Sequence, residues 1–358
     1  MSIRKLALAF IFFIVFIVGV PVFVGTILWV RMTDLYRGYT EVEQFVEIPP
    51  GAGTSEIGRR LIDAGVVRDQ WSYRAAIWWT GDARKLKAGE YRFDRPVSAV
   101  AVVEKLAKGD VYGRRVTFPE GLTIAEMAKL YESHELGKAA DFVAAARDVS
   151  RIADIDPGAR DLEGYLFPET YTLPRGIPAE RLIGMMVDRF HAVFTPDMRQ
   201  RVAEQGRTIR EVVTLASLVE KETAQAAERP LVAAVYRNRL KIGMGMQADP
   251  TVVYALAKAG RYDGNIRKED LAFNSPYNTY RYPGLPPGPI ASPGKASLEA
   301  AIDPADVKYL YFVSRNDGTH VFAETLDAHN RNVQKFQVEY FRAQKTQQAK
   351  PQKPKRSS

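Results

Sequence analysis

A single glutamate, Glu220, has the setting of a general acid. It lies in the segment TIREVVTLASLVEKET, residues 208–223. Apolar side chains recur there at helical spacing, and Glu220 follows Ala216 by four residues and Val213 by seven. This spacing places it on the apolar side of the helix or at its edge. Loss of water raises the pKa of a carboxyl group, and a raised pKa suits an acid at neutral pH. Glu220 is therefore a candidate catalytic acid.

The same glutamate also has an ordinary structural interpretation. Glu220, Lys221 and Glu222 form a short charged run, and such runs are commonly the solvated end of a helix or part of a structural ion pair. Glu222 lies about 200° around the helix from Glu220, so the two carboxylates cannot share a face. We therefore expect one acid rather than a pair, with Glu222 in a structural or orienting role.

A second polar constellation lies between residues 244 and 290. Its segments are MGMQADPTVVYAL and NSPYNTYRYPGLPPGPI. The Pro and Gly run at 284–289 cannot be a helix or a central strand. We interpret it as a fixed wall suited to a polysaccharide groove, with a flexible linker as the alternative. The candidate groove residues are Gln247, Asp249, Asn278 and Tyr280, although a capping or buried role for Asp249 is at least as well supported.

Regular elements must position these side chains. Thr208 and Glu211 form a T-x-x-E capping box that begins the Glu220 helix. Pro230 has the place of a first helical residue in the next helix. The further expected elements are an amphipathic helix at 178–194, a helix at 231–240, a β-hairpin joining 308–313 to 321–322 and a final helix at 326–341 that Thr325 caps.

The N-terminal half contains two strand–turn–helix modules at an offset of 70 residues. The matching residues are Val46 and Val116, Pro49 and Pro119, Gly51 and Gly121, and Glu56-Ile57 and Glu126-Met127. In the first module, Thr54 or Ser55 is the expected helix cap. Helices at 71–80 and 99–107 and a strand at 89–93 follow it. We expect 161–175 to be an irregular surface segment whose aromatic rings pack on the core rather than stack on sugars.

Residues 6–30 form an uncharged apolar stretch of about 25 residues, enough to span a bilayer with some tilt. Arg4 and Lys5 precede it, Arg31 closes it, and Trp29 stands at the far interface, where Trp is favoured. A cleaved signal peptide is the alternative, but no convincing cleavage site follows the apolar core. The positive N-terminal flank predicts a cytoplasmic N-terminus, so the rest of the chain would lie outside the cytoplasm.

Composition excludes several functional classes for the 358 residues. There is no Cys, which excludes disulfides and thiol chemistry, and the four His are scattered without metal-binding spacing. The net charge is +8, but residues 342–358 hold six basic residues and no acid, so +2 remains for the rest. A basic tail, expected to be disordered, does not make a nucleic-acid face. We expect no metal, no cofactor and no nucleic acid.

The sequence resembles the YceG-like endolytic murein transglycosylases, the MltG family, over essentially its whole length. The segments that carry the resemblance are LASLVEKET at 215–223, RNRLKIGM at 237–244, MQADPTVVYAL at 246–256, NTY at 278–280, GLPPGPIASPG at 284–294 and YLYFV at 309–313. The resemblance implies an α+β protein with a transmembrane helix at 6–30 after a cytoplasmic N-terminus at 1–5. It further implies a LysM-like module at 42–112, a catalytic domain at 113–341 and Glu220 as the catalytic acid.

The implied reaction is cleavage of the bond between N-acetylmuramic acid and N-acetylglucosamine in nascent peptidoglycan without water. It leaves 1,6-anhydro-muramic acid ends and terminates strand elongation. The implied partners are glycan strands, the membrane and peptidoglycan synthases. The implied location is the inner membrane, with the catalytic domain in the periplasm. A non-catalytic membrane-anchored scaffold for cell-wall synthases and a hydrolytic muramidase are the alternatives.

Overall fold

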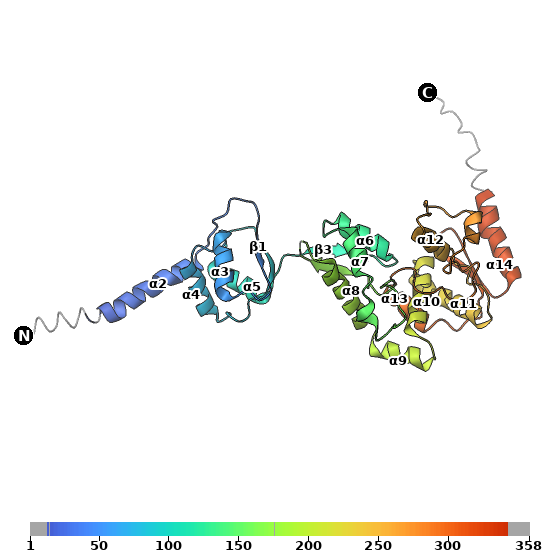
Figure 1. The fold of residues 1–358 in the computed structure, drawn as a ribbon, viewed down its shortest axis with the longest axis horizontal. Coiled ribbons are helices and arrows are strands. Elements are labelled where there is room, and N and C mark those ends of the chain that lie inside the picture. The colour runs from blue at the N-terminus through green and yellow to red at the C-terminus, as the bar shows by residue number, and fades with distance from the viewer. Residues whose placement is uncertain (1–12, 14, 175, 343–358) are drawn as a thin grey trace, which may run out of the picture. The chain divides into compact units, whose positions relative to one another are not determined.

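The computed structural model describes residues 13, 15–174 and 176–342. It separates into two units (Figure 1). The N-terminal unit runs to residue 115 and includes 172–174, and the C-terminal unit holds 116–171 and the residues from 176 onward. The expected cytoplasmic N-terminus, the first residues of the apolar stretch and the tail beyond Arg342 lie outside the described residues.

An apolar helix opens the described chain. A π-helical turn, η1 (Val15–Gly19), leads into α2 (Val20–Thr33). The stretch Phe16–Thr33 is long and apolar enough to cross a membrane by length and composition, and only 6% of it is buried. The helix continues past the predicted end at residue 30 and takes in Arg31.

The N-terminal unit packs three helices on a two-stranded antiparallel sheet. β1 (Gln44–Ile48) pairs with β2 (Gly89–Phe93), with Val46 opposite Tyr91. The helices are α3 (Thr54–Asp63), α4 (Gln70–Thr80) and α5 (Ala99–Lys108). Ser98 caps α5 and Gly109 ends it, in agreement with the helix predicted at 99–107. The expected cap of α3 is wrong, because Gly53 holds the capping position and neither Thr54 nor Ser55 makes a capping bond.

The C-terminal unit is mainly helical, and α10 (Ile209–Glu222) packs against α9, α11, α12 and α13. The other helices are α6 (Ile124–Ser133), α7 (Ala139–Ala145), α8 (Ala179–Val193), α9 (Pro196–Glu204), α11 (Arg229–Lys241), α12 (Asp249–Lys258), α13 (Lys295–Ile302) and α14 (Leu326–Val333), which continues into the π-helix η5 (Gln334–Glu339). Short 3₁₀ turns are η2 (Val149–Ile152), η3 (Ala226–Glu228) and η4 (Lys268–Ala272).

Two further strand pairs complete the fold. β5 (Tyr311–Ser314) and β6 (His320–Ala323) form the predicted hairpin, and Thr325 caps α14 as expected. β3 (Arg114–Thr117) pairs with β4 (Thr170–Leu173), and the division between the units falls within these two strands.

The predicted repeat is confirmed in the backbone. β1 leads through a turn into α3, and β3 leads through a turn into α6. The two turn glycines, Gly51 and Gly121, both take a left-handed conformation, with φ of 81° and 78°. This conformation strains any residue with a Cβ, which explains why glycine occurs at both positions.

The segment 161–175 differs from expectation. It was expected at the surface, but Leu162, Tyr165 and Leu166 are at most 1% exposed, and residues 170–173 form β4. The expectation that its aromatic rings pack on the core is confirmed by the stacking of Tyr165 edge-on against Phe190 of α8.

Candidate active site

The helix that carries the candidate acid begins as predicted. Thr208 N donates to Glu211 Oε2 at 2.7 Å, and Glu211 N donates back to Thr208 Oγ1 at 3.2 Å, which completes the capping box. Every residue from 212 to 219 is buried. Glu220 and Glu222 lie in the last turn of α10, directly after this buried stretch. The packed helix therefore fixes the backbone position of both residues.

The Glu220 carboxylate is held at both oxygens. Arg229 Nη2 donates to Oε1 at 3.2 Å, and the backbone N–H of Gly294 donates to Oε2 at 3.0 Å. The side chain of Glu220 is 6% exposed and that of Arg229 is 12% exposed. A charge-assisted bond and a backbone bond in a nearly dry setting fix the orientation of the carboxylate.

A second carboxylate, Glu120, shares the same guanidinium. Its Oε2 lies 3.6 Å from Arg229 Nη2, and its side chain is 48% exposed, so it faces the open side of the cluster. Desolvation is the main cause of a raised pKa for Glu120, the nearby charge of Glu220 raises it further, and Arg229 opposes both. One arginine thus serves two carboxylates, and the repulsion between them is one cause of the raised pKa of Glu120.

Gly294 makes this arrangement possible. A Cβ at this position would lie 1.8 Å from Glu120 Oε1. The missing side chain therefore lets the Glu120 carboxylate approach the same residue whose N–H binds Glu220. Neither Ala nor any larger residue fits there without displacing Glu120.

The wall segment 287–294 runs alongside α10. Ile290 N donates to Ser217 Oγ at 3.1 Å, and Ser217 is fully buried. Ser292 exchanges two backbone hydrogen bonds of 2.8 Å with Gly121 and Leu122. These bonds hold residues 290–292, which directly follow the Pro- and Gly-rich run at 284–289, and they bring the turn that carries Glu120 to the site. Within the run itself Pro286, Gly288 and Pro289 are buried, which argues against a flexible linker.

Glu222 has different partners from Glu220. Tyr236 OH donates to Glu222 Oε1 at 2.6 Å. Burial of the carboxyl group raises the pKa of Glu222 to about 7, and Asp249 adds to the rise, while the Tyr236 hydrogen bond and the charges of His320 and Arg239 oppose it. This position is consistent with the structural or orienting role expected for Glu222.

This raised pKa predicts a pH-dependent stability. Native Glu222 holds its proton up to about pH 7, whereas the unfolded chain releases it near 4.5. Its contribution is therefore complete below pH 4.5 and is lost as the pH rises to 7, by roughly 3 kcal/mol. Glu222→Gln, which cannot ionise, should show a smaller loss of unfolding free energy between pH 5 and 8 than wild type in urea titrations. Equal slopes would contradict the raised pKa.

The remaining sequence candidates divide into two groups. Tyr280 OH donates to Asp249 Oδ1 at 2.6 Å, and Gln247 is exposed two residues before Asp249, where α12 begins. Asn278 is instead fully buried. Its amide donates to the carbonyls of Leu271 and Phe273, and its Oδ1 accepts from the N–H of Tyr280. The structure thus corrects the interpretation of Asn278 as a groove residue, because its hydrogen bonds stabilise the loop.

Sequence reasoning missed three residues of the cluster: Arg229, Glu120 and Gly294. A signal for Glu120 was available, because it occupies the position that Pro50 holds in the first copy of the repeat. An acidic residue in place of the proline of the first copy is not needed for the turn, so it indicates a specific role for Glu120. Arg229 had no comparable signal beyond its place before Pro230.

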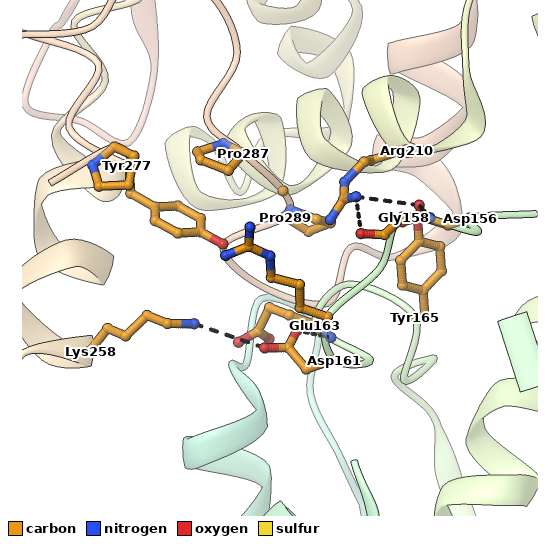
Figure 2. Close-up of a pocket in the computed structure, with 13 residues that line it drawn as sticks. Asp156, Gly158, Asp161, Glu163, Tyr165, Arg210, Lys258, Tyr277, Pro287 and Pro289 are labelled. Carbon is orange, nitrogen blue, oxygen red and sulfur yellow. Dashed lines mark hydrogen bonds and ion pairs between the residues drawn. The ribbon is translucent and has the colours of Figure 1, made fainter. Parts of the chain in front are cut away.

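A cavity of about 410 Å³ lies elsewhere in the C-terminal unit, next to Arg210 in the first turn of α10 (Figure 2). Arg210 Nη1 donates to the carbonyl of Gly158 at 2.6 Å, and Asp161 faces Lys258 at 3.9 Å. Burial raises the pKa of Glu163, on its wall, to about 8. None of the cavity-lining residues belongs to the Glu220 cluster. The cavity and the acid cluster therefore use different residues, although Pro287, Gly288 and Pro289 of the wall segment line the cavity.

Among residues 13, 15–174 and 176–342, no group of three or more His, Asp or Glu side chains is placed to hold a metal ion. The carboxylates of the cluster have Arg229 and a backbone N–H as partners. The arrangement offers proton transfer at a carboxyl group.

Comparison with known proteins gives one consistent result. The sequence model of the YceG-like family matches residues 46–335. A Bacillus subtilis protein named endolytic murein transglycosylase is 31% identical over 309 residues, which cover 81% of this chain and 84% of that protein. A protein of the same name from Streptococcus pneumoniae D39 is 33% identical over 322 residues, which cover 80% of this chain and 57% of that protein.

A solved structure is also similar. The crystal structure of a yceG-like protein from Listeria monocytogenes has a TM-score of 0.56 and 31% sequence identity, and the match covers 82% of this chain and 99% of that chain.

Proposed function

This chain belongs to the YceG-like family, and we propose that it is an endolytic murein transglycosylase in which Glu220 is the catalytic acid. The assignment of Glu220 rests on the two hydrogen bonds that its carboxylate accepts, one from Arg229 and one from the Gly294 N–H. The names of the relatives from Bacillus and Streptococcus support the activity, and the chain spans 84% of the former.

The reaction needs one proton donor that later becomes a proton acceptor. The Glu220 carboxyl group gives its proton to the oxygen that links N-acetylmuramic acid to N-acetylglucosamine, and the bond from C1 to that oxygen breaks. The 6-hydroxyl of the same muramic acid attacks C1 and passes its proton to the Glu220 carboxylate. The acid is regenerated, no water is consumed, and a 1,6-anhydro ring remains.

Arg229 and Gly294 assist the stage at which Glu220 is ionised. Their two hydrogen bonds stabilise the carboxylate that forms when the glycosidic oxygen takes the proton. Glu120 competes for the same guanidinium, because its Oε2 lies 3.6 Å from Arg229 Nη2.

The substrate groove is proposed to include Gln247, Asp249 and Tyr280, with Glu222 orienting the helix end behind them. Gln247 and Asp249 are exposed, and Tyr280 keeps 36% of its surface exposed while its hydroxyl binds Asp249. Exposed amide, carboxylate and phenol groups can bind sugar hydroxyls, and the ring of Tyr280 offers an apolar face for a pyranose.

The anchoring and placement of the enzyme belong to the same proposal. The apolar helix that ends at Thr33 would hold the protein in the inner membrane with its N-terminus in the cytoplasm and both units in the periplasm. The module at 42–112 would be LysM-like and bind glycan, and peptidoglycan synthases would be the partners. Support for the anchor comes from the length and composition of Phe16–Thr33.

Mass spectrometry of digested glycan strands tests the function. Uncrosslinked strands incubated with residues 32–358 should release internal fragments that end in anhydro-muramic acid. Those ends are lighter than reducing ends by one water, so reducing ends would identify a hydrolase. Binding of the strands with no fragments at all would favour the scaffold role.

A further inference from the structure

The four tryptophans of the chain gather on one surface. Trp71, Trp78 and Trp79 lie on α4, and Trp29 lies near the end of α2. Their exposed fractions are 65%, 82%, 54% and 45%, in that order. Trp is among the costliest side chains to leave in water, so a group of exposed tryptophans indicates an interaction surface.

The outer face of α4 carries large apolar side chains as well as its inner face. Ser72, Tyr73 and Ala76 are buried against the unit. On the opposite side, Trp71, Arg74 and Trp78 follow one another at helical spacing and are all exposed. The core of the unit already accounts for the inner face, so packing within the chain does not explain the tryptophans outside.

Two contacts tie α4 to the end of the apolar helix. The rings of Trp29 and Trp79 meet edge to face with centroids 4.6 Å apart. Arg31 Nη1 binds Asp69 Oδ2 at 3.1 Å, and Asp69 also caps α4 by accepting from the N–H of Ser72. α4 therefore begins beside the last turns of α2, where Figure 1 also draws it.

The occupant of this surface follows from its continuity with α2. The stretch Phe16–Thr33 has the length and composition of a membrane span, and its last turns carry Trp29 and Arg31. Trp and Arg side chains favour the head-group layer of a bilayer, where the ring is partly buried and the charge stays wet. A helix with exposed Trp and Arg beside the end of a span therefore has the side chains that suit the head-group layer.

We propose that α4 lies in the head-group layer of the membrane that α2 enters, with the rings of Trp71, Trp78 and Trp79 inserted between lipids. The inference rests on the proposed membrane anchor and goes beyond it. The N-terminal unit is then docked on the bilayer at two places, α2 and α4, rather than suspended from one helix.

Tryptophan fluorescence tests this directly, because the intrinsic Trp emission of the chain comes from this surface alone. The full chain is reconstituted in vesicles of zwitterionic and anionic lipids that carry bromine, a contact quencher, either near the head group or near the chain end. Wild-type protein should lose most of its emission, and shallow bromines should quench more than deep ones. Loss of only a minor share would contradict docking through α4.

Single-tryptophan variants separate the two helices. Each keeps one tryptophan, with the other three changed to Phe, and circular dichroism verifies the fold. The control carries Val42→Trp in a chain whose four tryptophans are all Phe, since Val42 is 82% exposed just before β1. Trp71 and Trp78 should be quenched strongly by shallow bromines, and the control should not.

The outcomes distinguish docking from anchoring. Quenching of Trp29 without Trp71 and Trp78 would overturn the docking of α4 and leave the anchor in place. No quenching at any position would overturn both. Quenching of Val42→Trp as strong as that of Trp78 would also overturn the proposal, because contact with lipid would then not be specific to α4.

Discussion

Glu220→Gln is expected to abolish the release of anhydro-ended fragments while leaving the fold intact. Glutamine keeps the shape of glutamate and can still accept the Gly294 hydrogen bond, but it can neither give up a proton to the glycosidic oxygen nor take one back. General acid or base catalysis contributes roughly 10²–10⁴-fold per role, and Glu220 is assigned both roles in succession. The turnover number should therefore fall by at least about 10³-fold, measured as fragments released per enzyme by mass spectrometry.

A matched control is Glu299→Gln on α13, the helix that packs against α10. The side chain of Glu299 is 51% exposed and pairs with Lys295, so the same chemical change should leave turnover within a few fold of wild type. Circular dichroism and thermal unfolding of both variants should match wild type. Full activity of a folded Glu220→Gln protein would remove Glu220 from the mechanism.

Arg229→Met should cost both stability and activity. The substitution keeps an unbranched, flexible side chain but leaves Glu120 and the nearly buried Glu220 without their shared positive charge. Removing one partner of a buried ion pair costs about 3–5 kcal/mol of unfolding free energy. Turnover should also fall, because the carboxylate that forms on proton donation loses its strongest hydrogen bond. Arg229→Lys should recover part of both losses.

The unfolding free energy lost in Arg229→Met is expected to increase with pH. The charge of Arg229 lowers the pKa of Glu120, so its removal raises that pKa further above the unfolded value. A carboxyl group with a raised native pKa stabilises the fold fully below its unfolded pKa and loses that contribution as the pH rises. The deficit of Arg229→Met should thus be larger at pH 8 than at pH 5 in urea titrations.

Arg267→Met is the control for that experiment, because Arg267 pairs with Asp263 at an exposed site. An exposed pair contributes little to stability, so its loss should change neither stability nor its slope with pH. If Arg229→Met behaved like this control, the Glu120–Arg229–Glu220 cluster would make no measurable contribution to the free energy of unfolding.

The helix that carries Glu220 was predictable because its signals are local. Thr208 and Glu211 are three residues apart, and the apolar spacing that follows is a property of one segment. The same holds for α5 between Ser98 and Gly109 and for the hairpin of β5 and β6. The short α13, largely buried and rich in Ala, has no amphipathic contrast to reveal it.

Two partners of Glu220 were not predictable from the sequence, because they are distant from it along the chain. Glu120 lies 100 residues before it and Gly294 lies 74 residues after it, and packing of separate segments brings them together. Asn278 illustrates the same limit. An Asn in a polar loop is as suited to binding sugar as to binding backbone, and only its burial decides between the two.

The wall beside α10 has a consequence for how this chain can vary. Two of its backbone N–H groups, at Ile290 and Gly294, bind side chains one helical turn apart on α10. Backbone bonds place little demand on which side chain stands at position 290, but they fix how many residues lie between the two positions. An insertion or deletion there would break one bond or the other, whereas extra residues before the wall, in the loop that precedes Pro287, would leave both in place. In this part of the chain, the number of residues between positions 290 and 294 is more tightly constrained than the residue type at each position. Gly294 is constrained in both respects, because a Cβ there would collide with Glu120.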